Sequence, residues 1–196
     1  PEDDPLLTKF DVVVCGGGAA GLTLANLLAD MSGGALRIAL VDTKLESRKH
    51  GPRTSAIAIG PKQMLASMGA WSLESAFAAP VRRIEVSDAQ ESVEAIVPDL
   101  TFQCAEYDEA LAWIIRHSEL ETHLRDIARS RDIRFIEGEI VGYKPNGAFA
   151  QIELRDGGAL GARLVVAADG AQSRLRELAK VQCVEWSYDR SAIVAT

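Results

Sequence analysis

The chain has 196 residues, of which 47% are hydrophobic and 25% are charged, and its formal net charge is −7. This composition is typical of a globular protein that buries a core. Runs of Lys and Arg are no longer than a pair such as Arg82-Arg83, which excludes nucleic acid, because phosphate binding needs a clustered basic face. The three cysteines are far apart, and the acidic N-terminus lacks the pattern of a signal peptide. We therefore expect a cytoplasmic chain without a transmembrane segment.

The first 42 residues predict a strand, a helix and a second strand. Residues 12–15 form a short apolar run that leads into a glycine cluster, and residues 22–31 are rich in Ala and Leu. Residues 36–41 form a second apolar run, which ends at Asp42. Continuously apolar strands are typical of a sheet that is buried on both faces, and a strand–helix–strand unit of this length places its strands in parallel.

The rest of the chain mixes further helices with short strands, and the pattern becomes β-rich after Pro80. Ser118 and Glu121 have the spacing of a capping box, which predicts that a helix begins there. The other expected elements are a helix between Pro61 and Gly69, a helical face through residues 120–128, and strands at 84–87, 93–97, 133–136, 139–144, 148–154 and 164–168. The order of elements predicts an α/β fold with a parallel sheet.

The glycine cluster is a G-x-G-x-x-G motif at residues 16–21. In such a motif Gly16 allows the tight turn out of the strand, Gly18 lets the backbone approach a pyrophosphate, and Gly21 lets the helix pack closely on the strand. The N–H groups of Ala19 and Ala20 begin the helix, where the helix dipole favours an anion. The motif therefore predicts a phosphate-binding turn.

Asp42 stands 21 positions after Gly21, at the end of the second strand. A carboxylate at this place can accept hydrogen bonds from both ribose hydroxyls of an adenosine. Its alternative role is that of a turn residue at the end of a strand. In this context the motif and the acid together predict dinucleotide binding, and they suit NAD as well as FAD.

A second motif follows the apolar run at residues 164–168. By itself Asp169-Gly170 is an ordinary turn. The whole string "ADGAQSRLR", however, resembles the Asp-Gly motif of the para-hydroxybenzoate hydroxylase group of flavoprotein monooxygenases. In that group the Asp-Gly segment lies near both the FAD and the route of the nicotinamide cofactor.

Within this group the chain is most similar to the ubiquinone-biosynthesis hydroxylases. The similar stretches are spread along nearly the whole chain in the family's order, and they are "RTSAIAIGPKQMLASMGAW", "WIIRHSELETHLRDIA", "ARLVVAADGAQSRLRELA" and "WSYDRSAIVAT". The resemblance implies that Arg53 lies close to the flavin. It also places His117 beside the flavin, at a position where the family more often has Asn, Gln or Arg.

The resemblance implies a Rossmann-like FAD-binding domain that uses NAD(P)H and O2 to hydroxylate an aromatic ring, with a prenylated phenol as the substrate class. The flavin carries that chemistry, so no catalytic side chain is assigned. The three histidines lack the spacing of metal ligands, and no metal is expected. The resemblance implies two partners: an aromatic small molecule as substrate, and a membrane-bound biosynthetic complex with which the chain would associate peripherally.

The resemblance also implies two domains and a chain that continues further in the family. Residues 1–80 and 113–182 correspond to the FAD-binding domain, and residues 81–112 and 183–196 to part of a β-rich substrate domain. The family's later Gly-Asp motif is absent. We therefore expect the N-terminal portion of a longer enzyme, which holds FAD weakly or not at all, lacks hydroxylase activity and self-associates through open strand edges.

Three alternatives stay open from the sequence. An NAD-dependent dehydrogenase would use the same glycines and Asp42, although the β-rich segment after Pro80 interrupts the alternation that such a domain would continue. A related flavoprotein, such as a halogenase or a prenyl reductase, would share this half. A non-catalytic flavoprotein-like module in a biosynthetic complex is the third alternative.

Overall fold

The computed structural model describes residues 8–45, 53–71, 78–87, 100–103, 110–189 and 191. The chain packs as two compact units, the first made of Pro1–Pro52 and Glu121–Thr196 and the second of Arg53–Leu120. The FAD-binding and substrate domains expected from the sequence have other boundaries, and that functional division stays a prediction.

The first unit is built on a six-stranded sheet in the order β8-β2-β1-β11-β10-β9. The first four of these strands run parallel, whereas β10 and β9 are antiparallel additions at one side. The strands are β1 (Thr8–Cys15), β2 (Ile38–Asp42), β8 (Ile133–Glu137), β9 (Ile140–Asn146), β10 (Phe149–Leu154) and β11 (Ala159–Ala167). The α/β fold with a parallel sheet, predicted from the sequence, is confirmed.

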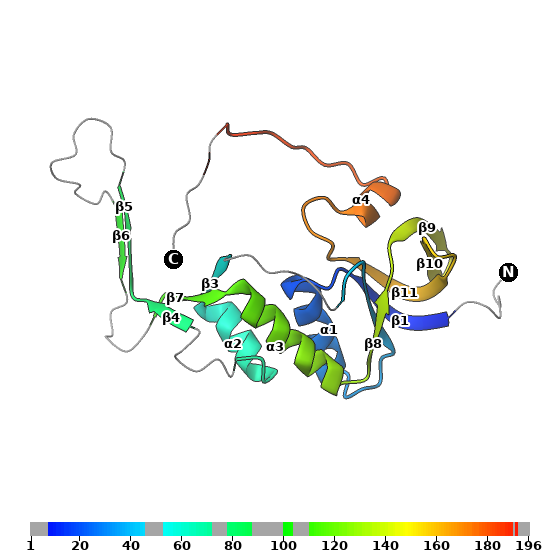
Figure 1. Cartoon of the computed structure of the whole chain (residues 1–196), viewed down its shortest axis with the longest axis horizontal. Helices are drawn as coiled ribbons and strands as arrows, with labels where there is room; N and C mark the ends of the chain where they lie inside the picture. Colours follow the sequence, from blue (N-terminus) through cyan, green and yellow to red (C-terminus); the bar gives the residue numbers. More distant parts are fainter. Residues whose placement is uncertain are drawn as a thin grey trace. The chain divides into compact units, whose positions relative to one another are not determined.

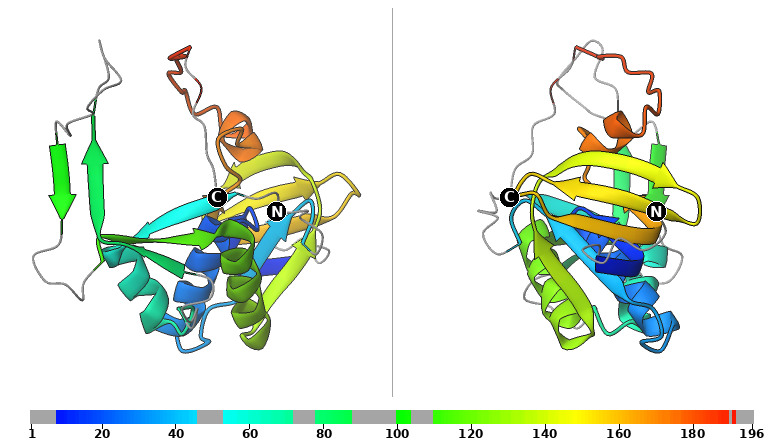
Figure 2. Two further views of the ribbon diagram at one scale, coloured as in Figure 1. Left: turned by 60° about the vertical axis from the view of Figure 1, so that its left-hand side comes forward. Right: turned by 90° about the vertical axis from the view of Figure 1, so that its right-hand side faces the viewer.

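Helices cover both sides of this sheet. Helix α1 (Ala19–Met31) and the helix α3 (His117–Ser130) lie side by side on one side, and the short α4 (Arg174–Leu178) lies on the other, as Figures 1 and 2 show. All five residues of β2 are buried, which explains why its sequence is continuously apolar up to Asp42. A core cluster between sheet and α4 joins residues from β1, β2, β10, β11 and α4, including Val13, Ile152 and Leu175.

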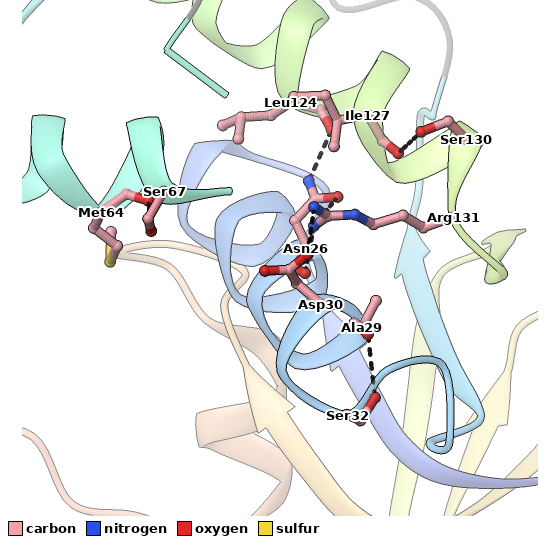
Figure 3. Close-up of polar contacts among 10 residues, drawn as sticks. All are labelled: Asn26, Ala29, Asp30, Ser32, Met64, Ser67, Leu124, Ile127, Ser130 and Arg131. Carbon is pink, nitrogen blue, oxygen red and sulfur yellow. Dashed lines mark hydrogen bonds and ion pairs between the residues drawn. The ribbon is translucent and has the colours of Figure 1, made fainter. Parts of the chain in front are cut away.

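A polar contact fixes α1 against α3 (Figure 3). The Asn26 side chain is fully buried, and its Nδ2 donates to the Leu124 carbonyl oxygen at 2.9 Å. Arg131 donates to the Asn26 carbonyl oxygen at 2.5 Å and to Asp30 at 3.1 Å. A buried amide is costly unless it is hydrogen-bonded, so this contact sets the register of the two helices.

In its described residues, the second unit contains an antiparallel sheet in the order β3-β7-β4, the helix α2, the first turn of α3 and a separate two-stranded ribbon, β5-β6. Lys62 stacks over the ring of Trp113 at 3.9 Å from its centroid, and Trp71 meets Trp113 edge to face. The strand expected at residues 93–97 lies outside the described residues. The elements are β3 (Thr54–Ala58), α2 (Ile59–Ser67), β4 (Ala78–Val81), β5 (Arg83–Val86), β6 (Leu100–Gln103) and β7 (Ala112–Arg116).

The capping box expected at Ser118 and Glu121 is wrong. Helix α3 already begins at His117, so Ser118 lies inside the helix rather than at its N-cap. The Glu121 carboxylate instead accepts a hydrogen bond from the backbone of α1. The sequence has the spacing of a capping box, but Glu121 makes a tertiary hydrogen bond to α1 instead of a local one at the start of α3.

Candidate functional site

The turn after β1 requires glycine at two positions. Gly16 has φ +120°, and a Cβ there would overlap the Ala168 carbonyl oxygen of the neighbouring chain segment. A Cβ at Gly21 would overlap the Gly16 carbonyl oxygen. The first glycine therefore makes the tight turn and the last lets α1 sit close to the strand, which are the roles that the motif predicts.

The N-terminus of α1 lies directly after this turn. Gly18 is the N-cap of α1, in an extended conformation, and Ala19 and Ala20 are the first two helical residues. Gly18 and Ala19 are half-buried, and Ala20 is exposed. The N–H of Gly18 has no hydrogen-bond partner within the described part of the chain. A helix N-terminus with such a donor can accommodate a phosphate.

Asp42 lies at the end of β2 beside the turn, and it is only 9% exposed. Its Oδ2 accepts a hydrogen bond from the Gly17 N–H at 2.5 Å, and its Oδ1 accepts from the Lys44 N–H at 3.1 Å. Its Oδ1 also accepts a hydrogen bond from the Thr43 hydroxyl at 3.3 Å. The structure brings Asp42 together with the glycine motif, and its ribose contact stays a prediction.

The Asp-Gly segment lies next to the same turn. The position that a Cβ on Gly16 would take lies 2.8 Å from the Asp169 backbone nitrogen. Asp169 Oδ2 accepts from the Leu175 N–H at 3.1 Å, whereas its buried Oδ1 has no hydrogen-bond partner among the described residues. Gly170 has φ +91°, which suits glycine. Burial, together with the charge of Asp169, raises the pKa of the Cys15 thiol to about 12.

A cavity of about 370 Å³ lies between the sheet and α4, beside the Asp-Gly segment. Its lining is mostly apolar and includes Tyr143, Val165, Gly170, Leu175 and Arg176. Ser173, another lining residue, caps α4 by accepting a hydrogen bond from the Arg176 N–H at 3.0 Å. The cavity therefore belongs to the surroundings of the second motif.

Arg53 and His117 come together in the second unit. The backbone N–H of His117 donates to the Arg53 carbonyl oxygen at 3.0 Å. The Ser55 hydroxyl lies 2.8 Å from Nδ1 of His117, so the imidazole ring is held by a side chain from β3. Arg53 itself is exposed. The expected contact of both residues with a flavin stays a prediction.

Two residues of the site escaped the sequence analysis, Glu121 and Arg125 of α3. Oε1 of Glu121 accepts from the Ala19 N–H at 3.2 Å, and an Nη of Arg125 lies 3.5 Å from the Gly17 carbonyl oxygen. Both side chains are buried. The signal was present: residues 121, 124, 125 and 128 share one helical face, and charged residues rarely occupy a buried face without a partner or a task.

Among the described residues, no group of three or more His, Cys, Asp or Glu side chains is placed to hold a metal ion. None of the helices in this part of the chain is both long enough and apolar enough to span a membrane.

The fold and the glycine turn define a dinucleotide-binding α/β protein of the class in which a pyrophosphate meets the first helix. The chain belongs to the FAD binding domain family, whose model matches residues 9–192. Its relatives include the mouse (Mus musculus) protein "Ubiquinone biosynthesis monooxygenase COQ6, mitochondrial", with 32% identity over 96% of this chain. Another is "Ubiquinone hydroxylase UbiL" of Rhodospirillum rubrum, with 28% identity over 95% of this chain.

The chain spans only 42% and 43% of the lengths of these two relatives. A solved structure with a similar fold is that of pqsL, a probable FAD-dependent monooxygenase from Pseudomonas aeruginosa, with a TM-score of 0.73 and 20% identity. The match covers 92% of this chain and 48% of that structure. The resemblance inferred from the sequence is thereby confirmed at the level of the family and the fold.

Proposed function

We propose that this chain supplies the FAD-binding part of a monooxygenase that hydroxylates an aromatic ring with NAD(P)H and O2. The observation that carries the proposal is the assembly of the glycine turn, Asp42 and Asp169-Gly170 at one end of the parallel sheet. The family membership and the COQ6 and UbiL relatives support FAD as the dinucleotide and a ubiquinone precursor, a prenylated phenol, as the substrate. A cytoplasmic location stays part of the proposal.

The residues present fit the adenosine end of FAD. A Cβ at Gly16 or Gly21 would overlap backbone, so the turn keeps its close approach, and the Gly18 N–H is available to a phosphate oxygen. Asp42 would accept the ribose hydroxyls. Arg53 and His117 would contact the flavin ring, and Asp169 and Gly170 would lie near the FAD and the route of the nicotinamide cofactor. When bound, FAD would supply the oxygen-activating chemistry, while the chain would orient it and exclude water.

The sheet order favours this proposal over an NAD-dependent dehydrogenase. Strands β2 and β8 are parallel neighbours, yet the chain between them forms the antiparallel sheet β3-β7-β4 and the ribbon β5-β6 before α3. A dehydrogenase domain would continue the alternation of strands and helices at this place. The β-rich excursion instead fits a second domain that is inserted into the sequence of an FAD-binding domain.

Substitution of Asp42 tests the cofactor assignment. In a form of the protein as long as its curated relatives, Asp42→Ala removes two charge-assisted hydrogen bonds to the ribose, and FAD affinity should fall by at least about tenfold. Asp156→Ala is the matched control, since the Asp156 carboxylate also accepts a hydrogen bond from a backbone N–H within a turn, that of Gly158 at 3.0 Å. Flavin fluorescence titration measures both. Equal affinities for the two variants would show that Asp42 is a turn residue only.

The reaction is tested separately. The FAD-loaded long form should oxidise NADPH in air when a prenylated phenol is added, and mass spectrometry should find the product heavier by one oxygen atom. The 196-residue chain should bind FAD only weakly and catalyse nothing, because it spans less than half the length of its curated relatives. Stoichiometric FAD binding by this chain below about micromolar concentration would contradict that expectation.

A further inference from the structure

Helix α1 begins without a side-chain cap. Its N-cap is Gly18, no side chain of the cap bonds to the helix, and no acidic residue stands in its first turn. The first N–H groups of a helix lack intrahelical partners and carry a partial positive charge. The compensating groups therefore come from elsewhere in the chain.

Side chains distant in sequence hold the peptide groups around Gly18. The N–H of Gly17 donates to Asp42, the carbonyl oxygen of Gly17 faces Arg125 at 3.5 Å, and the N–H of Ala19 donates to Glu121 at 3.2 Å. The carbonyl oxygen of Gly18 accepts from the Leu22 N–H at 2.9 Å. The peptide groups on both sides of Gly18 are thus fixed in orientation.

The contact of Arg125 bears directly on the Gly18 N–H. The carbonyl of Gly17 and the N–H of Gly18 belong to one planar trans peptide group, so they point in opposite directions. A guanidinium at the carbonyl oxygen therefore orients the N–H toward the opposite side and strengthens it as a donor, because hydrogen bonds in a chain polarise one another. Within the described residues, these contacts leave the Gly18 N–H without a hydrogen-bond partner.

Burying these two charges is expensive. Glu121 is 1% exposed and Arg125 is 8% exposed, and removing a charge from water costs several kcal/mol, about as much as a good pairing returns. Nε of Arg125 is buried without a hydrogen-bond partner in the described part of the chain. Leu120, Leu124 and Ala128 already give α3 its buried apolar contacts. Packing of α3 alone does not explain an acid and a base at these positions.

We propose that Glu121 and Arg125 are positioning residues, which hold the peptide groups on either side of Gly18 so that its N–H meets a phosphate oxygen of the dinucleotide. The inference rests on the proposed function, since it concerns the same turn. It assigns the preorganisation of the anion site at α1 to two residues of α3, which lie 102 and 108 positions from their contacts in the sequence.

Three variants of the 196-residue chain separate the contributions. Glu121→Gln keeps an acceptor for the Ala19 N–H and removes the charge, Glu121→Leu removes the acceptor at similar volume, and Arg125→Met removes the donor and keeps the aliphatic stem. Arg134→Met is the matched control, because Arg134 is exposed on β8. The probes are ADP, which carries a pyrophosphate, and adenosine, which does not, titrated into ¹⁵N-labelled chain by NMR so that weak binding is measurable.

We expect the Gly18 amide resonance to move on addition of ADP. Glu121→Leu and Arg125→Met should each weaken ADP binding by at least about tenfold and change adenosine binding by less than about threefold, whereas Glu121→Gln and Arg134→Met keep ADP affinity within about threefold. Equal losses for ADP and adenosine would mean a structural role only. Unchanged ADP affinity in both Glu121→Leu and Arg125→Met, or a loss in Glu121→Gln as large as in Glu121→Leu, would overturn the inference.

A readout without nucleotide keeps this inference distinct from the proposed function. If the wild-type chain does not bind ADP, the cofactor assignment fails for this chain, and the positioning is judged from the Gly18 N–H residual dipolar coupling. That coupling should be preserved in Glu121→Gln and averaged toward zero in Arg125→Met. Should Glu121→Leu fail to fold, the Ala19 amide decides for Glu121: its ¹⁵N shift must change in Glu121→Gln, and an unchanged shift contradicts the hydrogen bond.

Discussion

The glycine turn after β1 and the ribbon β5-β6 represent opposite degrees of structural constraint. At the turn, Gly17 and Ala19 are held by contacts from β2 and α3, and a Cβ on Gly16 or Gly21 would overlap backbone. In the ribbon, every residue of both strands is exposed. The pairing of Ile84 with Phe102 and of Val86 with Leu100 puts four large apolar side chains on one face, each between 40% and 51% exposed.

This difference shows where the chain's own residues complete a structure and where they do not. A two-stranded ribbon is marginally stable by itself, and contiguous exposed apolar side chains mark surfaces that favour contact with other groups. The turn, by contrast, is completed by side chains from two other elements of the same unit, β2 and α3. Substitutions should therefore be costly near the turn and almost neutral for stability in the ribbon.

The largest contrast is expected between two isoleucines in strands. Ile38 of β2 is 2% exposed, and Ile38→Ala should lower the free energy of unfolding by about 2–5 kcal/mol, because it leaves a cavity in the core. Ile84 of β5 is 40% exposed, and Ile84→Ala should change it by less than about 1 kcal/mol. Urea denaturation followed by circular dichroism measures both. Similar losses in the two variants would show that the ribbon is packed in solution.

A pair of helical glycines gives the next effect. Gly21→Ala in α1 should destabilise the fold by about 1–3 kcal/mol, because the new methyl group meets the Gly16 carbonyl oxygen. Gly60→Ala in α2 meets no atom within 4 Å and should stabilise by up to about 1 kcal/mol, as expected for Ala in a helix. Denaturation midpoints compare them directly. A neutral Gly21→Ala would mean that α1 can move away from the strand at no cost.

Local signals in the sequence predicted most of the turn. The apolar runs of β1 and β2, the glycine spacing and Asp42 follow each other within one βαβ unit, so periodicity and turn chemistry were sufficient. Glu121 and Arg125 were missed because their partners lie 102 and 108 residues away. The capping-box pattern also offered Glu121 a local role, which the tertiary contact replaced.

The topology was less accessible from the sequence. Strand β8 pairs with β2 at one edge of the sheet, although the β-rich excursion separates the two strands in the sequence. No local sequence pattern encodes which edge of the sheet β8 joins when the chain returns to it. The ribbon was recognised only in part, since its strand β5 was expected near residues 84–87 but β6 was not. Its exposed apolar face depends on the pairing register, which alternation within one short strand does not reveal.

A smaller effect concerns the thiol at the end of β1. Cys15 is fully buried, and its pKa is raised from 9.0 to about 12. Because the folded state favours the neutral thiol, this stabilisation is complete below pH 9 and is lost as the pH rises toward about 12. Between pH 9 and 10 the loss should be about 1 kcal/mol. Unfolding free energies of wild type and Cys15→Ala at several pH values measure it.

The control for Cys15 is the exposed Cys183. Cys183→Ala should leave the alkaline pH dependence as in the wild type, and at pH 8 a thiol reagent should modify Cys183 rapidly while Cys15 stays protected in the folded chain. The same alkaline slope in Cys15→Ala as in the wild type would show that another group, such as Tyr or Lys, is responsible.

The smallest effect on stability, and the sharpest test of the ribbon, is expected from Phe102→Ser. Phe102 is 49% exposed and stands opposite Ile84, so its loss should change the free energy of unfolding by no more than about 0.5 kcal/mol. If the apolar face of the ribbon drives the self-association expected from the sequence, the variant should shift the chain toward monomer in sedimentation velocity. Met31→Ser is the matched control, because Met31 at the end of α1 is 83% exposed but lies outside the ribbon, and it should leave association unchanged. An equal shift in both variants would assign the association to general surface hydrophobicity. No shift in Phe102→Ser, in a chain that does associate, would place the contact elsewhere, with the open edges of the sheet strands β8 and β9 as the next candidates.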